Sequence, residues 1–194
     1  MRRLCVFCGS ASGSQSVYAE AAQQFGRLLV AEGWELVYGA GHVGLMGVIA
    51  DAVLQAGGVA IGVIPRSLVE RELAHDGLSE LHVVETMHER KALMADLSDA
   101  FVALPGGHGT CDELFEILTW AQLRLHAKPI GMLNVANYFD PLLAWLDQTV
   151  SLGFVRPQDR GLLLSSADPT HLLRLLETHR GSAEEPGPLE SDER

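Results

Sequence analysis

Short apolar runs alternate with longer helix-like segments along almost the whole of this 194-residue chain. The short runs are apolar nearly throughout, as expected of strands that are covered by helices on both faces. Strand–helix alternation with right-handed crossovers predicts an α/β fold with a doubly wound, Rossmann-like and mostly parallel sheet. We expect about six to seven strands, with helices on both faces of the sheet.

The periodicity predicts where these elements lie. The expected strands are Leu4–Gly9, Glu35–Gly39, Val59–Ile64, Leu81–Glu85, Ala100–Leu104 and Pro129–Leu133, with a short last one at Gly161–Ser165. The expected helices are Gln15–Glu32, Leu45–Ala56, Met87–Ser98, Thr110–Leu125, Tyr138–Ser151 and Pro169–Thr178. We expect residues 1–180 to form one domain. Residues 181–194 hold five acids and one arginine among Gly, Pro and Ser, which predicts a disordered acidic tail.

Composition limits the partners of the chain. The net charge of -11 argues against wrapping nucleic acid, which needs a basic face. No apolar run approaches the roughly 18–20 residues of a membrane helix, and the apolar stretch near the N-terminus is too short for a signal peptide. Cys5 and Cys8 lie three residues apart in a strand-like run, so their side chains should point to opposite faces. With Cys111 they are expected to be free thiols in a cytoplasmic protein that binds no metal and no cofactor.

Three glycine-rich turns follow expected strands and precede expected helices. The first contains Gly9 and Ser10, the second Gly41 and Gly44, and the third Gly107, Gly109 and Thr110. The carboxyl ends of parallel strands share one edge, where ligands bind in such sheets. Glycine lets the backbone approach a ligand, and helix N-termini attract phosphate. One such turn is explained equally well as a tight connection, whereas three on one rim favour a phosphate or nucleotide site.

Two charged residues lie where apolar ones would be expected. Thr86 and Glu89 have capping-box spacing, so a helix should begin after Thr86 and place Arg90 on its inward stripe. A buried guanidinium needs an anionic partner, either an internal carboxylate or a bound phosphate. Glu113 follows the third glycine turn. It is either a partner of the helix dipole or a carboxylate that stabilises the cation-like ribose formed when a glycosidic bond breaks.

Two motifs connect these observations to a known family. Residues 105–113 read Pro-Gly-Gly-His-Gly-Thr-Cys-Asp-Glu, and residues 87–91 read Met-His-Glu-Arg-Lys. They resemble the P-G-G-x-G-T-x-x-E and M-x-x-R-K patterns of the Lonely Guy family, cytokinin riboside 5′-monophosphate phosphoribohydrolases that are often misnamed lysine decarboxylases. The resemblance runs from about Leu4 to Leu176. It implies a homodimer that hydrolyses the N-glycosidic bond of N6-modified or plain adenosine 5′-monophosphate and releases the free base and ribose 5-phosphate.

The resemblance also assigns roles to residues. It implies that Arg90 and Glu113 are catalytic and that the turn from Gly107 to Glu113 holds the monophosphate. The substrate-binding residues that it implies are Glu72, Arg90, Lys91, Gly107, His108, Gly109, Thr110, Cys111, Asp112, Glu113 and Thr119.

The chain departs from the family pattern in two turns. Ala40 and His42 stand in a turn that usually reads Gly-Gly-Gly-Ser, and His108 replaces a tyrosine. His108 could protonate a leaving base or be an ordinary surface histidine.

Two other functions stay open. One is a non-catalytic nucleotide or cofactor carrier on the same fold. The other is a pyridoxal-phosphate decarboxylase, which would need Lys91 or Lys128 as its Schiff-base lysine. Lys128 precedes a strand and so lies at the wrong end of the sheet.

Overall fold

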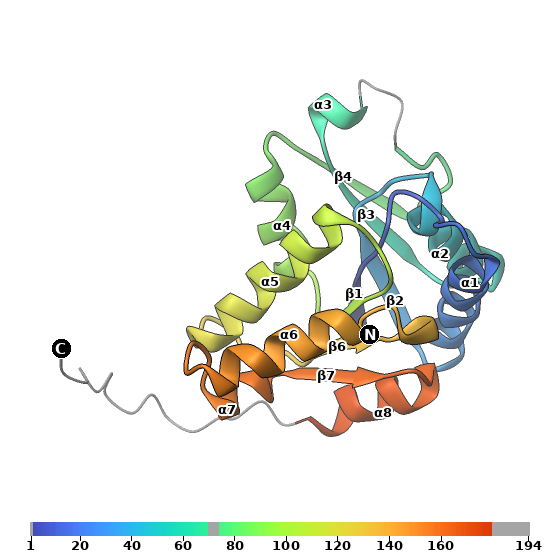
Figure 1. Ribbon diagram of the computed structural model, residues 1–194. Helices are drawn as coiled ribbons and strands as arrows, with labels where there is room; N and C mark the ends of the chain where they lie inside the picture. The colour runs from blue at the N-terminus through green and yellow to red at the C-terminus, as the bar shows by residue number, and fades with distance from the viewer. Residues whose placement is uncertain (1, 70–73, 180–194) are drawn as a thin grey trace.

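A single parallel sheet forms the centre of the computed structural model, which describes residues 2–69 and 74–179 (Figure 1). Its seven strands lie in the order β4-β3-β2-β1-β5-β6-β7, and every neighbouring pair is parallel. The strands are β1 (Arg2–Phe7), β2 (Trp34–Tyr38), β3 (Ala60–Pro65), β4 (Glu80–Val84), β5 (Ala100–Ala103), β6 (Ile130–Leu133) and β7 (Leu163–Ser166). The predicted doubly wound α/β fold is confirmed.

Helices cover both faces of this sheet. They are α1 (Ser16–Ala31), α2 (Gly44–Gln55), α3 (Arg66–Val69), α4 (Met87–Asp96), α5 (His108–Gln122), the 3-10 helix η1 (Val135–Asn137), α6 (Asp140–Ser151), α7 (Pro157–Arg160) and α8 (Pro169–Thr178). The six long helices were predicted. The sequence did not reveal α3, η1 and α7, because three or four residues are too few to show a hydrophobic period.

The buried side chains divide into two clusters, one on each face of the sheet. Leu4 and Val6 pack under α1, α2 and α8, whereas Cys5 and Phe7 pack under α4, α5 and α6. This alternation along β1 is the two-residue period of a strand with both faces covered. Cys8 joins the cluster opposite Cys5, and both thiols are free, as the sequence predicted.

The strand order creates a switch point beside β1. The chain first places β2, β3 and β4 on one side of β1 and then returns to place β5, β6 and β7 on the other. Connections therefore leave β1 and β5 in opposite directions, and a crevice opens at the carboxyl ends of these strands. The glycine turns that contain Gly9 and Gly107 follow β1 and β5 directly.

The predicted boundaries are correct to within two residues except at the C-terminal end of α5, which was placed three residues too late. The helix α5 begins at His108 and not at Thr110, because Gly107, with φ of -98° and ψ of -149°, is non-helical and serves as the N-cap. It ends at Gln122 and not at Leu125, because Arg124 takes a left-handed conformation with φ of 62°.

Two predictions lie outside the described residues. They concern Glu72 and the tail from residue 181. Strands drawn from positions 2 to 166 share one sheet, and the single domain over residues 1–180 stays a prediction. Across the described parts of the chain, no helix has the length and apolar character needed to cross a membrane.

Candidate active site

The three glycine turns meet at the carboxyl edge of the sheet. The amide of Gly9 donates to the carbonyl of Pro105 (3.1 Å), and the carbonyl of Gly9 accepts from the amide of Leu45 (3.0 Å). The first turn is thus hydrogen-bonded to both of the others. A cavity of about 280 Å³ lies between the first and third turns and is bordered by Tyr18 and Tyr138, whose rings pack edge to face. The shared rim predicted from the sequence is confirmed.

Several of these glycines are required by packing inside the protein. A Cβ atom on Gly44, whose φ is +63°, would lie 2.3 Å from the backbone of Ser10. A Cβ atom on Gly41 would lie 2.6 Å from Met46, and one on Gly9 would lie 2.8 Å from the carbonyl oxygen of Ala11. Contact with backbone atoms therefore explains Gly9 and Gly44 without a ligand, whereas the atom nearest to Gly41 is the terminal methyl of the flexible Met46 side chain, which can move aside.

The third turn is different because two of its glycines face open space. A Cβ atom on Gly107 or on Gly109 would meet no atom within 4 Å, whereas one on Gly106 would lie 2.0 Å from Oγ1 of Thr110. Thr110 is only 3% exposed, because the early start of α5 places it within the first turn of the helix. Its side chain supports the turn from below, while Gly107 and Gly109 leave the backbone accessible to a ligand.

Arg90 is buried, as its place on the inward stripe of α4 predicted. The hydroxyl of Thr86 caps the helix by accepting from the amide of Glu89 (3.1 Å). The side chain of Arg90 then runs under the sheet edge, where Nε donates to the carbonyl of Val63 (3.1 Å) and Nη2 to that of Gly39 (2.9 Å). Its Nη1 has longer contacts, 3.8 Å to Sδ of Met87 and 4.0 Å to Glu113. Nη1 is therefore the nitrogen best placed to bind a substrate anion.

Glu113 faces Arg90 from the first turns of α5. Its Oε1 lies 4.0 Å from Nη1 of Arg90, close enough for strong attraction but too far for a hydrogen bond. Burial raises the pKa of Glu113 from 4.5 to about 7, although the nearby charge of Arg90 acts in the opposite direction. A carboxylate held in this state is the kind of group found at functional sites.

Next to this pair, α4 and α5 are joined by a second set of charges. Nζ of Lys91 lies 3.0 Å from Oδ2 of Asp112 and 3.0 Å from Oε2 of Glu116. The sequence indicated Lys91 and Asp112 but not Glu116. The signal for Glu116 was its spacing, since it follows Glu113 by three residues and so lies on the same side of the helix.

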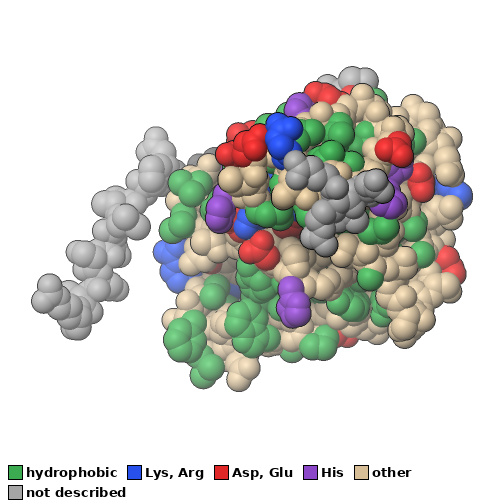
Figure 2. Space-filling view, turned by 90° about the horizontal axis from the view of Figure 1, so that it is seen from above, with side chains coloured by type: hydrophobic (Ala, Val, Ile, Leu, Met, Phe, Trp, Pro, Cys, Tyr) green, Lys and Arg blue, Asp and Glu red, His purple; other side chains and the backbone are tan. Residues whose placement is uncertain are grey.

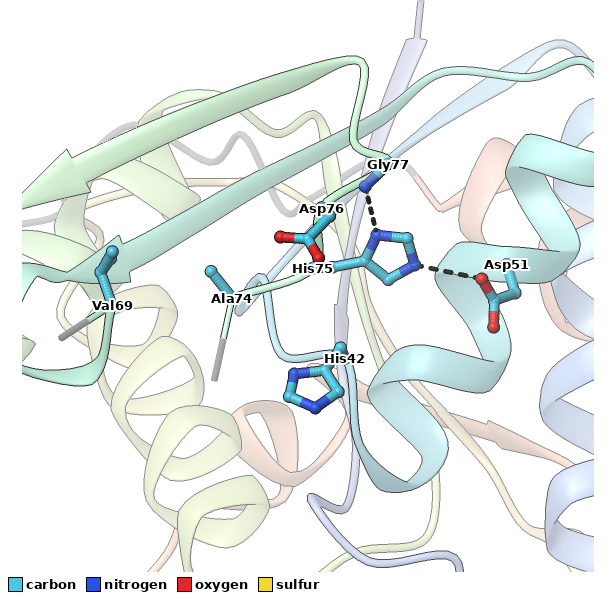
Figure 3. A pocket seen from close by; sticks show the side chains of 7 residues that line it. All are labelled: His42, Asp51, Val69, Ala74, His75, Asp76 and Gly77. Carbon is cyan, nitrogen blue, oxygen red and sulfur yellow. Dashed lines mark hydrogen bonds and ion pairs between the residues drawn. The ribbon is translucent and has the colours of Figure 1, made fainter. Parts of the chain in front are cut away.

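Figure 2 views the molecule from the side on which α3 lies. Acidic, basic and histidine side chains gather on this face. A second cavity, of about 640 Å³, is lined by His42, Asp51 and His75 and by Val69 and Ala74 (Figure 3). The ring of His75 lies between Asp51 and Gly77: Nε2 is 3.1 Å from Oδ1 of Asp51, and the amide of Gly77 donates to Nδ1. Within residues 2–69 and 74–179, no cluster of three or more His, Cys, Asp and Glu side chains could hold a metal ion.

Comparison with known proteins identifies relatives of this chain. The model of a family described as "Possible lysine decarboxylase" matches residues 46–176. The probable cytokinin riboside 5′-monophosphate phosphoribohydrolase LOGL1 of Oryza sativa subsp. japonica is 49% identical over 97% of this chain and 85% of its own. The cytokinin riboside 5′-monophosphate phosphoribohydrolase LOG2 of Arabidopsis thaliana is 48% identical over 92% of this chain and 84% of its own. The chain belongs to the Lonely Guy family.

Solved structures extend the likeness in fold alone. The molybdenum cofactor binding protein of Rippkaea orientalis superimposes with a TM-score of 0.69 over 91% of this chain and 95% of its own, at 22% sequence identity.

The substrate-binding residues that the Lonely Guy resemblance implies do not all lie together. His108 and Asp112 are exposed in the first turns of α5, and Cys111 is half-buried. Thr119 is exposed six residues beyond Glu113, about 9 Å along the helix, and its hydroxyl donates to the carbonyl of Phe115 (2.7 Å). The structure thus brings Arg90 and Glu113 together beside the open third turn but leaves Thr119 apart from them.

The lysine residues fit the decarboxylase alternative poorly. Nζ of Lys128 donates to the carbonyl of Ala95 at the end of α4 (2.8 Å), near the amino end of β6. Lys91 is engaged with two carboxylates.

The raised pKa of Glu113 predicts a pH-dependent cost to stability. Between pH 4.5 and 7 the folded protein binds more protons at Glu113 than the unfolded chain does, so stability falls as the pH rises through this range. Glu113→Gln removes this effect. The difference in free energy of unfolding between the variant and the wild type should grow in favour of the variant by about 3 kcal/mol when the pH is raised from 4.5 to 8. Urea unfolding at both pH values measures this gain.

Glu20→Gln, an exposed change on α1, is the matched control and should show no such gain. If the difference in free energy of unfolding between Glu113→Gln and the wild type is the same at both pH values, the raised pKa of Glu113 is contradicted.

The two adjacent glycines of the third turn should behave differently on substitution. Gly106→Ala should lower the free energy of unfolding by about 1–3 kcal/mol, because its methyl group would overlap Thr110. Gly107→Ala should change stability by less than about 0.5 kcal/mol but weaken binding of adenosine 5′-monophosphate, because its methyl group would enter the ligand space. Urea unfolding and calorimetry with the nucleotide measure the two effects. Unchanged affinity in Gly107→Ala would show that the ligand lies elsewhere.

Proposed function

We propose that this protein hydrolyses the N-glycosidic bond of plain or N6-modified adenosine 5′-monophosphate and releases the free base and ribose 5-phosphate. The observation that carries the proposal is the pair formed by Arg90 and Glu113 beside the open backbone of Gly107 and Gly109. The relatives near 50% identity are named as phosphoribohydrolases of cytokinin riboside 5′-monophosphates, which supports this substrate class.

Glu113 acts on the charge that develops during bond cleavage. When the bond between C1′ and the base breaks, its electron pair leaves with the base and positive charge develops on the ribose ring. The carboxylate of Glu113 stabilises this charge. Water then adds its oxygen to C1′, and a proton derived from water goes to the base. Because only the ionised carboxylate can act in this way, kcat/KM should rise with pH through the titration of Glu113 near pH 7.

Arg90 and the third turn supply the binding of the 5′-phosphate. The amides at the start of α5 and the positive end of its dipole attract an anion, and Nη1 of Arg90 adds a charged donor. The remaining residues of the predicted binding set (Glu72, Lys91, His108, Thr110, Cys111, Asp112 and Thr119) stay predictions, as does the cytoplasmic location.

The first prediction of this function is that the substrate must carry its 5′-phosphate. Incubation with adenosine 5′-monophosphate or its isopentenyl derivative should release free base, whereas adenosine at the same concentration should react far more slowly. Chromatography of the released base measures both rates. Comparable rates would contradict a role for the third turn and Arg90 in phosphate binding, and nucleotide binding without base release would indicate a non-catalytic carrier.

The variant Glu113→Gln shows whether the released base comes from this site. It should lower kcat on the order of 10²-fold or more while the affinity for the nucleotide is kept or improved, since the neutral amide removes both stabilisation of the cation and repulsion of the phosphate. Arg90→Ala should weaken nucleotide binding as well as turnover. Near-normal turnover in Glu113→Gln would make Glu113 a partner of the helix dipole only.

A homodimer is the predicted assembly, and exposed apolar side chains on and after α5 and α6 support it. Trp145 of α6 packs edge-on against Phe115 of α5 and remains 50% exposed, and Phe154 beyond α6 is 81% exposed. Leu123 and Leu125 beyond α5 are also exposed. Large aromatic and apolar side chains that gather on one surface are typical of protein–protein interfaces.

Light scattering should therefore give about twice the chain mass of 21.0 kDa. Phe154→Asp should shift the protein towards the monomer, whereas Leu81→Asp on the edge strand β4 should not, although Leu81 is also an exposed apolar residue. A monomeric wild type would refute this assembly.

A further inference from the structure

Lys91 has an environment that is unusual for a lysine on a short helix. Its side chain is only 10% exposed, and its Nζ lies 3.0 Å from both Asp112 and Glu116. Burial disfavours the charge of Lys91, but its interactions with these two carboxylates outweigh it and raise the pKa of the ammonium. The ammonium of Lys91 is therefore stabilised by two carboxylates of the protein itself.

The position of this cluster along the chain links it to the catalytic pair. Lys91 directly follows Arg90 on α4, while Asp112 and Glu116 lie one residue before and three residues after Glu113 on α5. The catalytic pair itself is separated by 4.0 Å and shares no hydrogen bond. Among the ion pairs between described residues of α4 and α5, the short ones are those of Lys91.

We propose that Lys91 is a positioning residue for Glu113: its ammonium, held between Asp112 and Glu116, joins α4 to α5 and balances the charge beside the Glu113 carboxyl. This role deepens the proposed function and rests on it. It differs from the role that family resemblance implies for Lys91, which is direct contact with the nucleotide. Asp112 and Glu116 share the positioning role, because they hold the ammonium in place.

The charges around Glu113 determine how the proposal can be tested. Among the described residues, Arg90 and Lys91 favour the carboxylate form of Glu113, and Asp112 and Glu116 disfavour it. On the opposite side, β1 and the turn after it contribute Cys5 and Cys8. Burial raises the pKa of both thiols, so they stay neutral. Removing Lys91 and removing its carboxylate partners should therefore move the titration of Glu113 in opposite directions.

The test is the pH dependence of kcat/KM for base release from adenosine 5′-monophosphate. Lys91→Met should shift the acid limb to higher pH and lower the rate at pH 6 by about threefold or more. Asp112→Asn and Glu116→Gln should shift the limb to lower pH, and Lys91→Arg should restore the wild-type profile. Lys128→Met is the matched control: it removes the only other lysine of the chain and should leave the profile unchanged.

A second readout does not depend on activity. The ¹³C shift of the Glu113 carboxyl in labelled protein reports its titration directly and should move in the same opposite directions. If the wild type releases no base, the proposed function fails, while this titration still tests the positioning role. Asp112 is exposed, so Asp112→Asn provides the test even if Lys91→Met does not fold.

Two results would overturn the proposal. The first is a Lys91→Met variant with an unchanged titration of Glu113 and more than tenfold weaker nucleotide binding, which would make Lys91 a substrate ligand. The second is a set of variants at Lys91, Asp112 and Glu116 that all leave the titration of Glu113 where it is in the wild type.

Discussion

The site depends on the burial of one guanidinium beneath the carboxyl edge of the sheet. Arg90 could not remain there unpaired, because a desolvated charge without partners is strongly unfavourable. The carbonyls of Gly39 and Val63 accept from it, and Glu113 provides the counter-charge. A Cβ atom on Gly39 would lie 1.7 Å from Nη2 of Arg90, so the guanidinium needs a glycine at that position. The glycine after β2 thus allows α4 to carry its arginine into the sheet edge.

The burial of Glu113 lowers the stability of the folded protein and favours the proposed catalysis. Burial disfavours the carboxylate form of Glu113, and the same burial removes the water that would weaken its proposed action on a developing cation. The flanking charges of Lys91, Asp112 and Glu116 lie on the two helices that carry the catalytic pair, so helix packing and site electrostatics are set by the same contacts. A change in any of them is expected to affect both properties.

The glycines of the rim serve two distinct purposes. Gly9 and Gly44 leave room for nearby backbone, that of Ala11 within the first turn and that of Ser10 against the second turn, and such packing needs no ligand. Gly107 and Gly109 relieve no contact within the protein, so their lack of side chains is best explained by a molecule that approaches the turn. All of these positions are glycine in the sequence. Only the neighbouring atoms in the structure show which glycines are needed for packing and which leave space for a ligand.

The alternation of apolar runs and helical segments by itself determined the doubly wound sheet, because both signals come from local periodicity and from the right-handed crossover. The inward position of Arg90 also followed from the sequence, since helix capping and helical spacing are local. Only the tertiary structure decided the partners of Arg90, the raised pKa of Glu113 and the inclusion of Glu116 in the charged cluster. Likewise, the sequence did not predict short helices such as α3 or the exact start of α5. These properties depend on burial and on distances between segments far apart in the chain, which no local pattern encodes.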